Sequence, residues 1–139
     1  MQHFKTVLAG LLFAAALPGC GASDDKPKNA DVSDDQRGIL ATVDALQTAS
    51  HAGDGAKVCS TVFTKSLVRS IEKASGRRCA TEVRKNLFRP KGSISVSRNI
   101  TVAGDAGTAV IREQNGNVST LHVVRQGGTW RIDRVTPRQ

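Results

Sequence analysis

Apolar residues follow a helical spacing in the first part of the chain. From Ile39 to Leu87 they recur every three or four residues, a spacing that lines one face of an α-helix. Ser33 to Gln36 fits a capping box before this stretch, and Pro90 ends it. The spacing predicts three helical segments, with these residues on their inner faces: Ile39, Val43, Leu46 and Ser50; Val58, Val62, Phe63, Leu67, Val68 and Ile71; Cys79, Val83 and Leu87.

The period changes to two after Pro90. Arg98 interrupts the alternation at a predicted bulge or rim position, and Asn115-Gly116 predicts a two-residue turn with positive φ at both residues. Helices followed by hairpin-connected strands predict an α+β fold, in which N-terminal helices pack on a curved four-stranded antiparallel sheet. The predicted strands cover Ile94–Val102, Thr108–Gln114, Val118–Arg125 and a segment beginning at Trp130, with turns at Gly104–Gly107, Asn115-Gly116 and Gly127-Gly128.

The N-terminus has the organisation of a signal sequence. Lys5 precedes an apolar run from Val7 to Leu17, which would be about 16 Å long as a helix and therefore too short to cross a bilayer. Residues 1–19 are accordingly interpreted as a signal peptide. Residues 20–35 are rich in polar and small side chains and are predicted to form a disordered acidic tether, followed by one domain over 36–139.

Leu17-Pro18-Gly19-Cys20 resembles the lipobox of bacterial lipoproteins, although Pro18 departs from the small residue usual at that position. The resemblance implies a diacylglycerol on Cys20, removal of residues 1–19, and an extracytoplasmic domain anchored to the bacterial cell membrane through lipid. The alternative is an ordinary secretory signal that is cleaved after Ala14-Ala15-Ala16 and leaves Cys20 as a free thiol.

Charge is distributed unevenly between the tether and the domain. Residues 20–35 carry five aspartates against two lysines, whereas residues 36–139 carry 17 basic and 7 acidic residues, a net charge of +10. A cationic ridge is predicted from Arg78, Arg84, Lys85 and Arg89, and it would contact anionic wall polymer or lipid headgroups. The alternative is an ordinary solvated helix face. Nucleic acid is not expected as a partner because aromatic residues are only 4% of the chain.

Two further cysteines, Cys59 and Cys79, predict a disulfide in an oxidising compartment, with free thiols as the alternative. A metal site would need more ligands than the two histidines of the mature chain, His51 and His122, which are not at ligand spacing from either cysteine. Neither a metal nor another cofactor is predicted.

Several segments together resemble small NTF2-like lipoproteins of the bacterial envelope. The likeness covers roughly residues 36–135 and rests on the capped first helix, on Gly53–Cys59 with a second cysteine about twenty residues later, on Val102–Asp105 and on Gly127–Ile132. It implies helices packed on a curved sheet that forms a cone with a pocket at its wide end.

Asp44, His122 and Trp130 are the candidate pocket residues of that cone, and the alternative is that Asp44 is a solvated helix residue and His122 lies at a sheet surface or edge. Enzymes of this fold use a pocket aspartate with a tyrosine or a protonated acid, but the chain has no tyrosine and no recognisable catalytic set. The leading hypothesis is therefore a non-enzymatic domain that binds a small apolar ligand or an anionic envelope component. The alternatives are an isomerase or hydrolase acting on a small hydrophobic substrate, and a structural protein, such as a homodimer, that associates through its sheet face.

Overall fold

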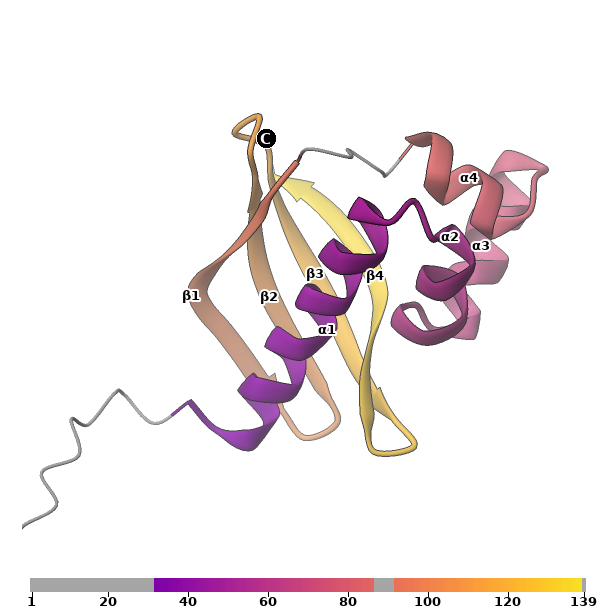
Figure 1. Cartoon of the computed structure of the whole chain (residues 1–139). Helices are drawn as coiled ribbons and strands as arrows, with labels where there is room; N and C mark the ends of the chain where they lie inside the picture. The colour runs from indigo at the N-terminus through magenta and orange to yellow at the C-terminus, as the bar shows by residue number, and fades with distance from the viewer. Residues whose placement is uncertain (1–31, 87–91, 139) are drawn as a thin grey trace, which may run out of the picture.

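One long helix lies across a face of the antiparallel sheet, and shorter helices gather beside the β4 edge (Figure 1). The computed structural model describes residues 32–86 and 92–138, so the predicted signal peptide, Cys20 and Arg89 lie outside it. Within these ranges the elements are α1 (Asp34–His51), α2 (Gly55–Lys57), the π-helical turn η1 (Val58–Val62), α3 (Lys65–Ser75), α4 (Cys79–Asn86), β1 (Ile94–Ala103), β2 (Ala106–Glu113), β3 (Val118–Gln126) and β4 (Thr129–Arg138). The strand order β1-β2-β3-β4 confirms the predicted meander and α+β class.

The capping box at the start of α1 is confirmed. The Ser33 hydroxyl accepts a hydrogen bond from the Gln36 amide at 3.2 Å, and the Gln36 side chain accepts one from the Ser33 amide at 3.0 Å. Asp34 and Asp35 therefore belong to the helix, two residues before the domain start predicted at residue 36. The predicted inner face of α1 is buried against the sheet.

The second helical segment is not continuous as predicted. Its first part is a π-helical turn closed by a hydrogen bond from the Phe63 amide to the Val58 carbonyl, after which the backbone becomes extended at Phe63. The Thr64 amide then donates to the Ile132 carbonyl of β4, and the Thr64 hydroxyl caps α3. The exposed edge of β4 thus supplies a backbone partner that interrupts the helix, which side-chain spacing alone cannot reveal.

The Cys59–Cys79 disulfide is present and joins η1 to α4, with the two Cα atoms 6.2 Å apart. Nearby, α2 and α4 approach so closely that a Cβ added at Gly55 would lie 2.3 Å from the Ala80 carbonyl oxygen. The small helices are therefore fixed both by a covalent bond and by backbone contact.

The hairpins lie where the sequence predicts them, with one change of turn type. Gly127 and Gly128 both have positive φ and form a two-residue turn between Gln126 and Thr129. At the β2–β3 turn, however, the Gly116 amide donates to the Glu113 carbonyl, so the loop has three residues and Gly116 takes the left-handed position. The predicted two-residue Asn115-Gly116 turn is therefore wrong.

The sheet bends at two register irregularities. One lies in β1 between Val96 and Ile100 and contains the predicted bulge residue Arg98, and the other lies between β3 and β4 after His122. Bulges increase local twist and re-aim side chains, so the strands can wrap around α1.

One end of the resulting cone is closed by a cluster around Trp130. The Arg125 guanidinium lies 4.9 Å from the Trp130 ring centroid and pairs with Asp35 of α1 and Asp105 of the β1–β2 turn. Gly38 faces the Trp130 ring so closely that a Cβ there would lie 2.6 Å from an indole carbon. Side chains fill this end, which leaves the opposite end for a cavity.

Candidate functional site

A cavity of about 630 Å³ opens between the C-terminal half of α1 and the inner face of the sheet. It lies at the end of the sheet where β1 begins and β4 finishes, the upper end in Figure 1. Its apolar lining comes from the helix, the η1–α3 junction and all four strands: Leu46, Phe63, Ile94, Ile111, Leu121 and Val135. A volume of this size and an apolar wall are typical of small-molecule sites.

Strand pleating explains why these residues face the cavity. Leu121 is directly opposite Val135 in the β3–β4 register, and Ile111 is opposite Ser119 in the β2–β3 register. Side chains of directly opposed residues lie on the same face of a sheet, and Leu121, Ile111 and Ser119 are buried. At the bulge after His122, β4 contains one extra residue, so Ile132 and Val135, three residues apart, pair with the inward-facing Val123 and Leu121.

The polar side chains of the cavity come from the ends of the elements. Ser50 and Ser119 are buried in its wall, and Glu113 lies half-buried at the end of β2. Gln47 accepts a hydrogen bond from the Ile94 amide at 3.2 Å, which fixes the start of β1 beside α1. Among the residues lining the cavity within the described ranges, Glu113 alone can carry a charge.

Asp44 does not face the cavity as predicted. Ile39, Val43 and Leu46 define the buried face of α1, and Asp44 is exposed. Because consecutive helical residues are turned by about 100°, a residue next to Val43 points away from the sheet. Asp44 lies beside the apolar stripe rather than on it, so the pocket placement is wrong and the alternative of a solvated helix residue is confirmed.

His122 lies on the outer face of the sheet, so the cavity placement is wrong and the alternative of a sheet-surface residue is confirmed. Its neighbours Leu121 and Val123 point inward and are buried, and alternate residues of a strand point to opposite faces. The His122 ring contacts the Thr136 hydroxyl at 3.2 Å and the Arg134 guanidinium at 3.5 Å on that outer face.

Trp130 is buried, but at the closed end of the cone rather than in the cavity. Its carbonyl accepts a hydrogen bond from the Thr42 hydroxyl at 2.9 Å, and its ring is held between Gly38 and Arg125. The residue that was predicted to line a pocket thus stabilises the opposite end of the same core.

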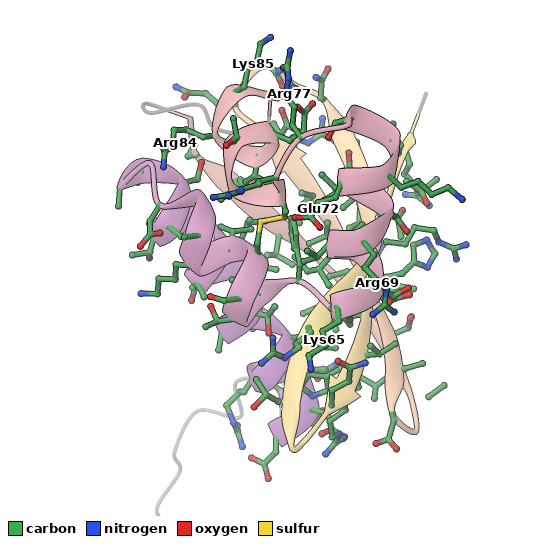
Figure 2. All side chains as sticks on the ribbon, turned by 90° about the vertical axis from the view of Figure 1, so that its right-hand side faces the viewer. Lys65, Arg69, Glu72, Arg77, Arg84 and Lys85 are labelled. Atoms are coloured by element: carbon green, nitrogen blue, oxygen red, sulfur yellow. A yellow bond between two sulfur atoms is a disulfide. The ribbon has the colours of Figure 1, made fainter. Side chains whose placement is uncertain are left out.

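The described part of the predicted cationic ridge is exposed. Arg84 and Lys85 project from α4, and Arg78 immediately precedes that helix (Figure 2 labels Arg84 and Lys85). The ion pairs found among the described residues involve none of the three. This geometry agrees with a solvated helix face as well as with a binding ridge.

Glu113 and Ser119 line the cavity, but neither was among the predicted pocket residues. Ser50 had been placed on the inner face of the first helix, and that placement is confirmed. Ser119 and Glu113 carry a detectable signal, because each alternates in register with inward apolar residues of its own strand, Leu121 and Ile111. Within the residues that the structure describes, no group of three or more histidine, cysteine, aspartate or glutamate side chains is arranged to hold a metal ion. Residues 32–86 and 92–138 also contain no helix with the length and apolarity needed to span a membrane.

The fold and the cavity define a class of protein, an α+β cone with a ligand-sized hollow at its open end. Two solved structures share this architecture, and both are described as NTF2-like proteins of unknown function. The protein from Shewanella baltica aligns with a TM-score of 0.55 at 14% identity, covering 75% of this chain and 92% of its own. The one from Methylobacillus flagellatus aligns with a TM-score of 0.59 at 14% identity, covering 79% and 97%.

These similarities show that the domain has the NTF2-like fold, as the sequence reading predicted. No protein-family model matches the sequence, and neither does any curated protein. Structural similarity thus establishes the fold, and the cavity is the feature of the molecule that bears on its ligand.

Proposed function

We propose that this protein is a non-enzymatic binding domain for a small apolar ligand, held on the outer side of the bacterial membrane by lipid on Cys20. The observation that carries the proposal is the apolar cavity of about 630 Å³ at the open end of the cone. Asp44 and His122 were the pocket candidates whose presence in the cavity would have favoured an enzyme, and both point away from that cavity.

The composition of the cavity determines the class of ligand. Burial of about 300 Å² of apolar ligand surface would contribute roughly 7 kcal/mol, of which association costs offset at least about 4 kcal/mol. A small apolar molecule without directed polar contacts would therefore bind with modest affinity. The buried hydroxyls of Ser50 and Ser119 provide places where one polar group of the ligand can be satisfied.

A filling substitution tests the site. Val135 is 38% exposed at the cavity, so Val135→Phe places a larger side chain into the space with little repacking of the core. Val110 lies on β2 one residue before the inward-facing Ile111, so Val110→Phe adds the same volume on the opposite face of the sheet.

The assay follows the fluorescence of the neutral apolar probe N-phenyl-1-naphthylamine with a detergent-free chain that begins at Val32. Val135→Phe should weaken probe binding at least about fivefold, whereas Val110→Phe should leave it within about twofold of wild type, since loss of one or two buried methylenes of contact costs about 1 kcal/mol or more. Equal binding by all three proteins, with unchanged melting temperatures, would contradict the cavity as the site.

The proposed lipid anchor can be tested separately from the cavity. Lipidation rests on Leu17-Pro18-Gly19-Cys20 after an apolar run, and the two acyl chains of a diacylglycerol are enough for stable anchoring. Mass spectrometry of the membrane fraction should find a mature N-terminus at a diacylated Cys20. A soluble protein that begins at another residue would refute the anchor and leave the cavity proposal unaffected.

A further inference from the structure

A second hollow, of about 580 Å³, lies on the outer side of the helical layer, between α3 and the β3–β4 hairpin. Three cationic side chains from two elements border it: Lys65 and Arg69 of α3, and Arg131 of β4. Figure 2 shows Lys65 and Arg69 on one side of the molecule, at the end of the helical layer away from Arg77 and Lys85. The remaining lining residues are Cys59, Ser60, Phe63, Val68 and Gln126, so no carboxylate borders this groove within the described residues.

No ion pair formed among the described residues neutralises the three cations. The ion pairs found among residues 32–86 and 92–138 involve Arg37, Arg77 and Arg125, but not Lys65, Arg69 or Arg131. The two closest acids in the sequence make other contacts. Glu72 accepts a hydrogen bond from the Cys79 amide, and Asp133 accepts one from the Thr64 hydroxyl.

Arg131 is held in place without a carboxylate. Its guanidinium donates to the carbonyl of Ser60, in the middle of the π-helical turn, at 2.8 Å and to the carbonyl of Phe63, directly after the turn, at 3.3 Å. A guanidinium has five N–H donors, so two backbone contacts leave donors free for a further acceptor. The groove therefore contains one preordered cation from the sheet and two exposed ones from the helix.

Lys65 and Arg69 lower the stability of α3 at the positions that they occupy. Lys65 is the first residue of this helix, where the helix dipole favours a negative charge, and the first turn contains no acidic residue. Arg69 lies four residues later, so the two like charges are neighbours on one face and repel each other. The two cations therefore do not serve the stability of α3, whereas an anion bound between them would offset their repulsion.

We propose that this groove binds a phosphate group. Three cations exceed what a single carboxylate would balance and fully offset the charge of about −1.5 to −2 that a phosphate group carries at pH 7, and guanidinium groups suit its oxygens geometrically. The Gln126 side chain lines the same hollow and adds an amide donor. Phe63, Val68 and Cys59 form an apolar wall against which the organic part of a phosphate ester can lie.

The test uses the full chain in nanodiscs of phosphatidylcholine, titrated calorimetrically with inorganic phosphate. The groove variant is Lys65→Gln with Arg69→Gln, and the matched control is Arg112→Gln with Arg138→Gln, which removes the same charge from exposed positions of β2 and β4. Arg131 is left intact because its backbone contacts also position η1. The wild type and the control should bind phosphate saturably, and the groove variant should bind at least about tenfold more weakly, because hydrogen bonds to charged groups contribute strongly.

A second arm identifies the source of the phosphate. Nanodiscs containing phosphatidic acid should weaken the apparent affinity for inorganic phosphate if the groove takes a lipid headgroup, and should leave it unchanged if the groove takes a soluble phosphate. Three results overturn the proposal: the wild type binds no phosphate saturably, the groove variant binds as the wild type does, or the control loses as much affinity as the groove variant. The last would show that net charge alone attracts the anion.

Discussion

Removal of the disulfide is the perturbation whose size the structure predicts best. Cys59 lies in the π-helical turn η1 and Cys79 begins α4, and their bond closes a loop that includes all of α3. Cys79 is buried and Cys59 is half-buried. The variant Cys59→Ala with Cys79→Ala removes the bond without adding a hydroxyl or a free thiol to the core.

The expected loss follows from the length of the loop. With a sequence separation of 20 residues, the chain-entropy relation gives about 3.3 kcal/mol at 25 °C. Packing replaces little of this constraint, because α3 has no buried residue and its apolar side chains only pack against the margin of the core. For a domain of about one hundred residues, such a loss lowers the melting temperature by roughly 15 °C or more.

Circular dichroism melting of the oxidised wild type, the reduced wild type and the double variant tests this value. The oxidised wild type should melt well above the other two, which should melt within a few degrees of each other. If the double variant melts with the oxidised wild type, then packing rather than the bond holds α3 and α4, and the reasoning is refuted. If the reduced wild type alone remains stable, the loss in the variant comes from the substitutions.

Two further substitutions each test one contact of the fold through its effect on the free energy of unfolding. Helix propensity alone would make Gly55→Ala stabilising by about 1 kcal/mol. Because the added Cβ would lie 2.3 Å from the Ala80 carbonyl oxygen, we instead expect destabilisation of about 1–3 kcal/mol. A raised melting temperature would refute that contact. Ser33→Ala removes one half of the capping box of α1 and should lower the free energy of unfolding by about 1 kcal/mol. An unchanged midpoint of urea unfolding would show that the remaining contact of the Gln36 side chain is enough to cap the helix.

The sheet could be predicted from the sequence because its signals are local. The alternation of apolar residues defines which side of each strand faces α1, and Gly127-Gly128 needs only the backbone freedom of its own two residues to form the observed turn. At Asn115-Gly116 the same kind of signal gave the hairpin correctly but not its loop length. The left-handed residue needed by a three-residue loop is also a glycine, so both turn types fit the sequence.

The break of the second helical segment depends on a residue that is distant in sequence. Phe63, Leu67 and Ile71 fit one helical stripe, yet the chain becomes extended at Phe63 because the Thr64 amide pairs with the Ile132 carbonyl of β4. That carbonyl is available only because β4 is the edge strand of the sheet. Helical periodicity holds no information about such a partner, so the π-helical turn could not have been foreseen.

The site was harder to predict than the fold because chemical reactivity guided the choice of residues. Asp44 and His122 were selected as groups able to carry out catalysis, but direction relative to the core decides what lines a cavity. Ser119 and Glu113, which do line it, alternate with the core residues of their strands. A reading based only on the inward phase of β2 and β3 would have found them.

Phe63 lines both hollows and separates them. It is 3% exposed, its amide is bound to the Val58 carbonyl, and its carbonyl accepts a hydrogen bond from Arg131. A buried side chain on a backbone held at both its amide and its carbonyl forms a wall between the two hollows, so one ligand would have to displace Phe63 to occupy both. The two hollows also differ chemically, since one is bordered mainly by apolar groups and the other by three cations. Val135→Phe and the Lys65 and Arg69 substitutions therefore report on separate sites, and failure of either proposal leaves the other standing.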